Sequence, residues 1–162
     1  MKVERWMTSP AITVPGDVPA SLALRKMLEN EIRRLPVLDE EDGVIGIVTD
    51  RDLRGALPPH GLPRAHGPYT QPEHDPLVRD CMRHAVAVVT PEDDIRHAVS
   101  LMHDLRISGL PVVRGRECVG VITITDLLEV LMAALDLAWN EVNEEIRNHQ
   151  PRPSAGQQES HR

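Results

Sequence analysis

The sequence contains no phenylalanine, one tyrosine and two tryptophans among its 162 residues. Its core must therefore be built from aliphatic side chains, and single-stranded nucleic acid would find no aromatic platform on which to stack. Basic residues are also outnumbered: 18 Lys and Arg stand against 25 Asp and Glu, which gives a formal net charge of −7. A negative protein does not attract phosphate backbones or anionic lipid, so this balance argues against a nucleic-acid partner and against a membrane surface.

Long apolar runs are missing as well. No stretch approaches the roughly 20 apolar residues of a membrane span, and the N-terminus MKVERWMTSP lacks the apolar run of a signal peptide. Cys81 and Cys118 match no CxxC pattern, and we expect them to be reduced rather than joined in a disulfide. These absences predict a soluble, cytoplasmic protein.

What the sequence does contain is a duplication. The stretch GIVTDRDL at 46–53 returns as GVITITDL at 120–127, and the flanking residues extend the match. The matched pairs are Met7 and Met82, Pro15 and Pro91, Met27 and Met102, Ile32 and Ile107, and Leu35-Pro36-Val37 and Leu110-Pro111-Val112. A period of about 75 residues is too long for a solenoid repeat, so the pattern predicts two homologous units.

Each unit is predicted to be β-α-β-β-α. A short extended run, AITV or AVAVV, ends at a proline-containing turn in which Asp17 or Asp93 can cap the next helix. That helix carries apolar residues at helical spacing, which are Leu24, Met27 and Leu28 in the first unit and Ile95, Val99 and Met102 in the second. The next two runs, LPVL with VIGIVT and LPVV with CVGVITI, read as strands, after which Asp52 and Asp126 begin new helices.

The predicted organisation has five parts: unit 1 at 1–57, a linker rich in Pro, Gly and His at 58–76, unit 2 at 77–132, a helical extension at 133–149 and a disordered tail at 150–162. His60, His66 and His74 of the linker fit no standard ligand set, and we expect no metal site there. The helical extension should pack on its own chain or on a partner subunit.

The Thr-x-x-Asp sequence of both copies suggests a binding chemistry. An Asp on the first turn of a helix, directly after a strand, points its carboxylate out of the end of the sheet. Its oxygens can accept both hydroxyls of a ribose, and the Thr three residues earlier can contact ribose or phosphate. The candidate ribose-binding residues are Thr49 with Asp52 and Thr123 with Asp126. The alternative is that these residues only cap their helices.

The duplicated pattern resembles a tandem pair of cystathionine-β-synthase (CBS) domains, the Bateman module, over residues 1–132. The resemblance is carried by the Met-Thr before the first strand, the helix ending in Met, the Ile-Arg-x-Leu-Pro-Val block and the Gly-h-h-Thr-x-x-Asp motif, in which h is apolar. The segment IRRLPVLDEEDGVIGIVTDRDLRGALP is most similar to stand-alone CBS proteins of the acetoin-utilisation type, here without their additional C-terminal domain.

The resemblance implies an α/β fold in which two units form a pseudo-twofold pair with two clefts between them, and a homodimer of such pairs. It also implies that the clefts bind adenosyl compounds such as AMP, ADP, ATP or S-adenosylmethionine, with no required cofactor. The adenine slot would combine the first strand of one unit with the residue after the motif glycine of the other. These residues are Ala11, Ile12 and Val121 for the cleft of Asp126, and Ala87, Val88 and Ile47 for the cleft of Asp52.

The family's phosphate-binding cations lie just before the Leu-Pro-Val strand and inside the Thr-x-x-Asp turn. The first unit offers Arg33, Arg34 and Arg51 there, whereas the second has Ser108, Gly109 and Ile124. In nucleotide-bound relatives such cations reach the ribose site of the other unit, so we predict that the cleft of Asp126 is the better phosphate site. Alternatively, Arg33 and Arg51 form surface salt bridges with Glu31 or Asp50. The histidines His84, His97 and His103 are interpreted as helix residues rather than anion ligands.

The sequence shows no nucleophile–base pair and no glycine-rich phosphate loop, so we predict that the protein is not an enzyme. We predict instead a regulatory protein that senses an adenine nucleotide and signals through the helix at 133–149 to an effector protein. Two alternatives stay open. One is a dimerisation module without a ligand, and the other is a nucleic-acid-binding regulator.

Overall fold

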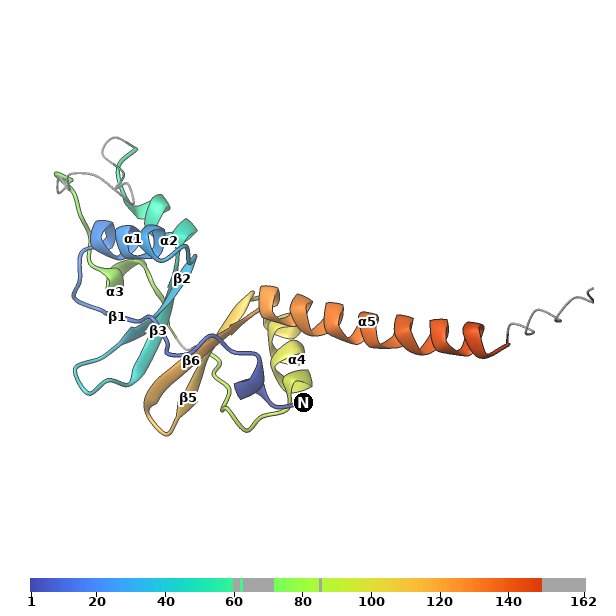
Figure 1. The fold of residues 1–162 in the computed structure, drawn as a ribbon. Helices are drawn as coiled ribbons and strands as arrows, with labels where there is room; N and C mark the ends of the chain where they lie inside the picture. Colours follow the sequence, from blue (N-terminus) through green and yellow to red (C-terminus); the bar gives the residue numbers. More distant parts are fainter. Residues whose placement is uncertain (60–61, 63–71, 85, 150–162) are drawn as a thin grey trace, which may run out of the picture. The chain divides into compact units, whose positions relative to one another are not determined.

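The computed structural model describes residues 1–59, 62, 72–84 and 86–149 (Figure 1). The chain divides into two compact units, Met1–Leu127 and Leu128–Arg162. The first is a mixed α/β unit, and the described part of the second is helical. Most of the predicted linker, with His60 and His66, and the predicted tail at 150–162 lie outside the described residues.

The first half of the Met1–Leu127 unit follows the predicted β-α-β-β-α order. Its elements are β1 (Val14–Pro15), α1 (Ala20–Glu29), β2 (Arg34–Leu38), β3 (Val44–Thr49) and α2 (Asp50–Ala56). Strand β1 pairs parallel to β2, β2 pairs antiparallel to β3, and α1 and α2 lie side by side (Figure 1). Both helices pack their apolar side chains against the sheet, which is how a half-buried sheet of this size hides its inner face.

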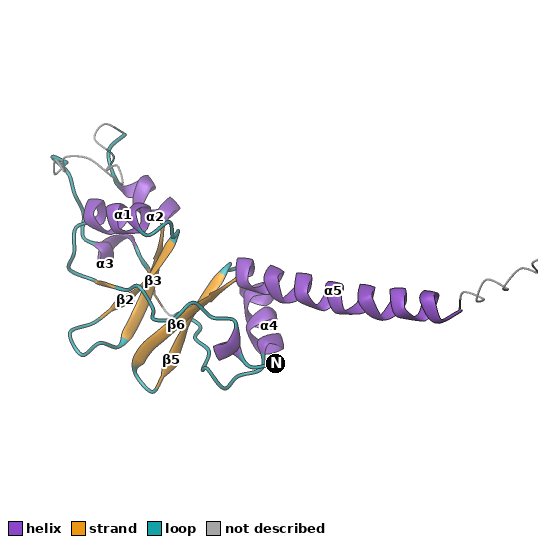
Figure 2. Cartoon of the chain, in the orientation of Figure 1, coloured by secondary structure: helices purple, strands orange, loops and turns teal. Residues whose placement is uncertain are grey.

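The second half repeats this order, again with a leading strand of two residues. Its elements are α3 (Val78–Cys81), β4 (Arg83–His84), α4 (Ile95–Leu105), β5 (Gly109–Arg114), β6 (Glu117–Thr123) and α5 (Ile124–His149). Strands β5 and β6 form an antiparallel hairpin beside the first sheet (Figure 2). The AVAVV run, expected to be a strand, contributes a single parallel bridge from Val89 to Val112, so that prediction was wrong over most of its length.

The leading segment of each half packs on the other half. Strand β4 pairs with β3 and completes a four-stranded sheet in the order β1-β2-β3-β4, while Val78 and Met82 are buried in the first core. Conversely, the short 3-10 helix η1 (Val3–Arg5) lies against the second half, where the Val3 N–H donates to the Asp93 carbonyl at 3.0 Å. The two halves are therefore interleaved: the segment before β1 packs on the second half, and the segment before α4 packs on the first.

The buried faces of the helices follow the aliphatic pattern of the sequence with one shift. In α1 the buried residues include Leu24 and Met27, as predicted. In α4 they are Ile95, Ala98 and Met102, and Val99 is 45% exposed, so its predicted place in the core was wrong. The reason is geometric: positions 95, 98 and 102 lie within about 60° of one another around the helix, and position 99 lies at the edge of this stripe, about 100° from position 98.

The predicted helix caps need correction too. Pro19, and not Asp17, occupies the N-cap position of α1, and its side chain makes no cap hydrogen bond. Asp94 caps α4 by accepting from the Arg96 N–H at 2.9 Å, while Asp93 accepts from the Thr90 N–H at 2.7 Å in the preceding turn.

Cys81 and Cys118 are free, as expected. Across the described part of the chain, no helix combines the length and the apolar character needed to cross a bilayer.

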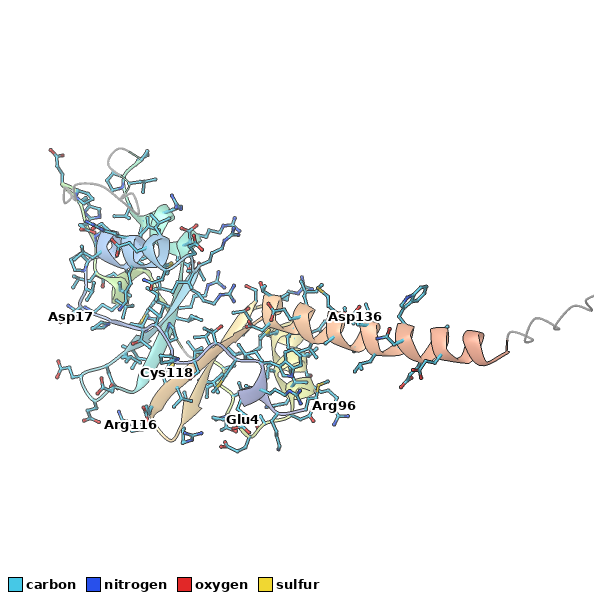
Figure 3. The ribbon with its side chains drawn as sticks, viewed as in Figure 1. Glu4, Asp17, Arg96, Arg116, Cys118 and Asp136 are labelled. Atoms are coloured by element: carbon cyan, nitrogen blue, oxygen red, sulfur yellow. The ribbon has the colours of Figure 1, made fainter. Side chains whose placement is uncertain are left out.

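Several aspartates are stabilised in their charged form. The pKa of Asp39 is lowered by the Gly43 N–H at 2.8 Å, by the Glu41 N–H and by the guanidinium of Arg116. Arg116 lies in the turn between β5 and β6 (Figure 3). The Thr90 N–H lowers the pKa of Asp93. The Arg96 side chain lowers that of Asp94, and His103 lowers that of Asp104.

A carboxylate whose pKa is lower in the folded state stabilises the fold above its unfolded pKa of about 3.9, and this contribution is lost as the pH falls through the folded value. We therefore expect the melting temperature to hold from neutral pH down to about pH 4 and to fall below it. Asp39→Asn should make the acid branch shallower. Calorimetric melting curves between pH 7 and pH 2 measure this, and an acid branch with the same slope in both proteins would contradict the role of Asp39.

Candidate functional site

A cavity of about 540 Å³ lies between the two halves and is called the first cleft. This volume is within the range of small-molecule pockets. Its walls come from the segment before β1, the residues that lead into β2, the end of β6 and the start of α5. The lining residues are Thr8, Pro10, Ala11, Ile12, Glu31, Ile32, Arg33, Arg34, Val121, Thr123, Thr125 and Asp126. The structure thus brings together Ala11, Ile12 and Val121 with Thr123 and Asp126, all of which the sequence assigned to one cleft.

Asp126 uses one carboxylate oxygen for the helix and leaves the other available. Its Oδ2 accepts from the Thr123 N–H at 2.6 Å and from the Thr123 hydroxyl at 2.8 Å, while the Asp126 N–H approaches Thr123 Oγ1 at 3.4 Å. Among the described residues, no donor is bonded to Oδ1. The capping role is therefore real, yet it does not exclude ligand binding, because Oδ1 keeps lone pairs for two hydroxyl groups.

A second cavity, the second cleft, has a volume of about 280 Å³. Its lining residues are Arg34, Ile47, Thr49, Arg83, His84, Val86, Ala87, Leu105, Arg106, Ile107, Ser108 and Gly109. Most of them are the duplication partners of residues in the first cleft. Thr123 corresponds to Thr49, Val121 to Ile47, and Ile32 to Ile107. The two clefts are thus related by the same internal repeat as the sequence.

The second cleft differs from the predicted one in two residues. Val88 is 39% exposed and does not line it, and Val86 takes that place beside Ala87. Asp52 forms the same capping box with Thr49 as its counterpart does, but it is not among the lining residues. Its Oδ1 lies 3.9 Å from Arg83 Nε, so part of its charge is already balanced.

The clefts differ most in charge. The first is lined by two arginines, Arg33 and Arg34, and two carboxylates, Glu31 and Asp126. The described lining of the second contains three arginines with His84, and no carboxylate. The difference arises at matched positions of the repeat, where Thr8 is replaced by Arg83 and Glu31 by Arg106. The first cleft is balanced, and the second is cationic.

The predicted phosphate-binding arginines divide into two groups. Arg33 and Arg34 line the first cleft, and Arg51 lines neither cleft. The salt bridges considered as an alternative are not formed with described residues, because Asp50 pairs with Arg54 at 2.8 Å and no described carboxylate pairs with Arg33 or Arg51.

Arg34 lies half-buried between the clefts. Its Nη2 donates to the Ser108 hydroxyl at 3.0 Å. Burial lowers the pKa of its guanidinium, and the nearby Asp126 carboxylate partly restores it. The guanidinium stays charged at neutral pH, so it is a desolvated cation without a full ion pair among the described residues, which favours an anionic ligand.

The sequence reasoning missed Arg83 and Arg106 and read His84 as a helix residue, whereas His84 belongs to β4. It sought cations only at the positions equivalent to Arg33, Arg34 and Arg51. Aligning the two halves around Thr8 and Glu31 would have found the two missed arginines. No group of three or more His, Cys, Asp or Glu side chains in the described residues is placed to hold a metal ion.

Comparisons with known proteins agree with this duplicated architecture. The family model for the CBS domain matches the chain twice, at residues 3–59 and 78–133. A CBS domain-containing protein of Dictyostelium discoideum is 31% identical over 136 residues, which cover 83% of this chain and 93% of that protein. Inosine-5′-monophosphate dehydrogenase of Methanocaldococcus jannaschii is 27% identical over 129 residues, but these cover only 23% of the enzyme.

Solved structures share the fold. A CBS domain pair crystallised in complex with 5′-methylthioadenosine and S-adenosyl-L-methionine superposes with a TM-score of 0.69, at 23% identity, over 83% of this chain and 98% of that one. A candidate acetoin utilization protein from Vibrio cholerae superposes with a TM-score of 0.66, at 27% identity, over 86% of this chain and 96% of that one. The fold inferred from the repeat is confirmed.

Proposed function

The chain belongs to the CBS domain family, with two CBS domains in tandem, and we propose that it is a cytoplasmic regulatory protein that senses an adenosine-containing ligand. The ligand would bind in the first cleft, with its ribose on Asp126 and Thr123 and its adenine between Ile12 and Val121. No catalytic step is part of this proposal.

The observation that carries the proposal is the convergence in one cavity of three kinds of group. A carboxylate oxygen without a partner among the described residues can accept the ribose hydroxyls. Apolar side chains of both halves, Ala11, Ile12 and Val121, provide the slot for a flat base. Arg33 and Arg34 provide cations for a phosphate or carboxylate at the other end of the ligand.

The solved CBS domain pair with a similar fold was crystallised in complex with 5′-methylthioadenosine and S-adenosyl-L-methionine, and this supports an adenosyl compound as the ligand. It does not favour AMP or ATP over S-adenosylmethionine. The balanced charge of the first cleft suits a ligand with one anionic group better than a polyphosphate, because further phosphates would face Glu31 without added cations.

The output would pass through α5. From Leu128 onward this helix carries apolar side chains exposed to solvent, among them Leu128, Leu131 and Leu135 at spacings of three and four residues. Such a stripe is typical of a helix that packs on another subunit. We propose a homodimer or an effector protein as its partner, with ligand binding shifting the equilibrium between two arrangements.

Isothermal titration of the full chain with AMP, ATP, S-adenosylmethionine and NAD tests the proposed ligand class. We expect micromolar binding of at least one adenosyl compound, with a matching rise in melting temperature because ligand binds only the folded state. Sedimentation with and without that compound would report a change in assembly. A folded, dimeric protein that binds none of the four would favour the ligand-free dimerisation module instead.

A further inference from the structure

Arg34 is the one described side chain that lines both clefts. The internal repeat explains how it does so. Its duplication partner is Gly109, which has no side chain, and the guanidinium of Arg34 occupies the space beside it. A Cβ on Gly109 would collide with Arg34 Nη1 and would lie 2.9 Å from Cδ and 3.0 Å from Cζ. One half therefore supplies a cation at this seam, and the other half supplies the room for it.

Arg34 interacts with one residue of each cleft. Its hydrogen bond runs to the hydroxyl of Ser108, which lines the second cleft. The carboxylate that acts on it electrostatically is Asp126, which lines the first. A guanidinium held by one neutral hydroxyl and a more distant carboxylate is free to turn toward a stronger acceptor, such as a phosphate oxygen, on either side.

Each cleft changes its charge when Arg34 is drawn away from it. The first cleft would keep Arg33 against Glu31 and Asp126, an excess of one negative charge. The second would keep Arg83 and Arg106, and would remain cationic. Both clefts would bind an anion less well without Arg34, and the first cleft would become repulsive to it.

We propose that Arg34 couples the two clefts as a shared anion ligand, so that an anionic group bound in one cleft weakens the binding of an anionic group in the other. This inference rests on the proposed function, because it requires a ligand in the first cleft. Since coupling between two binding sites is reciprocal, each ligand weakens the other by the same factor.

The sign of the effect depends on the charge of the ligand in the first cleft. An anion in the second cleft draws Arg34 toward Ser108 and leaves the first cleft more negative. A ligand with an anionic phosphate, such as AMP, then binds less tightly. S-adenosylmethionine also carries a carboxylate, but its sulfonium and ammonium make its net charge positive, so it is weakened less than AMP. The pair would thus favour a cationic adenosyl ligand over an anionic one whenever a small anion fills the second cleft.

The test uses pyrophosphate as a probe anion for the more cationic second cleft. AMP is titrated calorimetrically at increasing fixed concentrations of pyrophosphate, at constant ionic strength. We expect the apparent Kd of AMP to rise about tenfold and then to reach a plateau, which is the signature of coupling between separate sites. The same pyrophosphate series should raise the Kd of S-adenosylmethionine less than that of AMP.

Two variants isolate Arg34. Arg34→Gln removes the shared charge, and Gly109→Ala keeps every charge but places a methyl group where the guanidinium lies. In both, the plateau should fall toward onefold. Should Arg34→Gln bind AMP too weakly to measure, Gly109→Ala still gives the answer. Arg114→Gln is the matched control, because this arginine is 63% exposed and lines neither cleft, and it should keep the full coupling.

The outcomes separate the inference from the proposed function. If neither AMP nor S-adenosylmethionine binds the wild-type protein, the proposed function fails and the coupling fails with it. If AMP binds but its Kd is insensitive to pyrophosphate, or rises without a plateau as in direct competition, the coupling is wrong and the function stands. A plateau that survives Gly109→Ala would equally overturn the role of Arg34.

Discussion

Replacing Asp126 by alanine is expected to weaken the binding of an adenosine-containing ligand by about a hundredfold. In the proposed complex Oδ1 accepts two ribose hydroxyls, and hydrogen bonds to a charged acceptor contribute about 1.5 kcal/mol or more each. Two such bonds amount to about 3 kcal/mol, and every 1.4 kcal/mol corresponds to a factor of ten in Kd. Isothermal titration of the wild-type and Asp126→Ala proteins with the compound that binds best measures the loss.

The same substitution also removes a helix cap, and controls must separate the two effects. Loss of the bonds from Thr123 to Oδ2 should destabilise the start of α5 by about 1 kcal/mol. Asp126→Asn keeps an oxygen for the Thr123 N–H but removes the charge, so it should bind weakly while retaining most of its stability. Asp94→Ala removes the cap of α4 at a residue that lines neither cleft, and should lower stability without changing Kd.

The other copy of the motif decides whether the ligand has been assigned to the correct cleft. Asp52 is already within 3.9 Å of Arg83 and does not line the second cleft. We therefore expect Asp52→Ala to change adenosyl binding only a few-fold. If Asp52→Ala abolished binding and Asp126→Ala left it intact, the assignment of the ribose to the first cleft would be wrong.

Most of the residues that the sequence assigned to the first cleft line one cavity, because the parts of this cleft repeat in a recognisable frame. Thr123 and Asp126 belong to a motif that occurs twice, and the strand before a capped helix fixes where such a carboxylate points. Matching Ala11 and Ile12 to the second half required an exact alignment through a turn. A slip of one residue there named Ala87 and Val88 in place of Val86 and Ala87.

Other features depend on spatial relations that an alignment does not contain. Nothing in the order of residues states that η1 packs on the second half, or that β4 joins the first sheet. Arg34 enters the second cleft because Gly109 leaves room beside it, which is a contact between residues 75 positions apart in the chain. Composition likewise gave the sign of the net charge, but the local charge of each cleft is set by which few side chains meet there.

The interleaving of the halves leads to the second large effect, at Gly46. A Cβ at this position would collide with Met82 Sδ and would lie 2.9 Å from the Arg83 carbonyl oxygen. Gly120 shows the same relation to the other leading segment, since its Cβ would lie 2.8 Å from Met7 Sδ and 2.9 Å from the Thr8 carbonyl oxygen. We expect Gly46→Ala to lower the free energy of unfolding by about 1–3 kcal/mol, which is typical of overpacking in a tight core. Urea unfolding followed by circular dichroism measures it.

A double-mutant cycle tests whether the contact with Met82 is the cause. Met82 is buried, so Met82→Ala alone should also destabilise, by about 2–5 kcal/mol. Combined with Gly46→Ala, the two losses should be less than additive by at least about 0.5 kcal/mol, because the shorter side chain removes the collision. Strict additivity would show that Gly46 and Met82 act independently, and would leave the Arg83 carbonyl as the remaining obstacle.

The matched control is Gly55→Ala in α2, where a Cβ meets no atom of the described residues within 4 Å. Alanine is favoured over glycine inside a helix, so this change should raise stability by up to about 1 kcal/mol. Changes in unfolding free energy of opposite sign at Gly46 and Gly55 would show that the loss at Gly46 comes from its contact with the Met82–Arg83 segment and not from alanine itself. Because that segment carries Arg83 and His84 into the second cleft, Gly46→Ala should weaken pyrophosphate binding as well, which ties the packing of the two halves to the charge of the site they enclose.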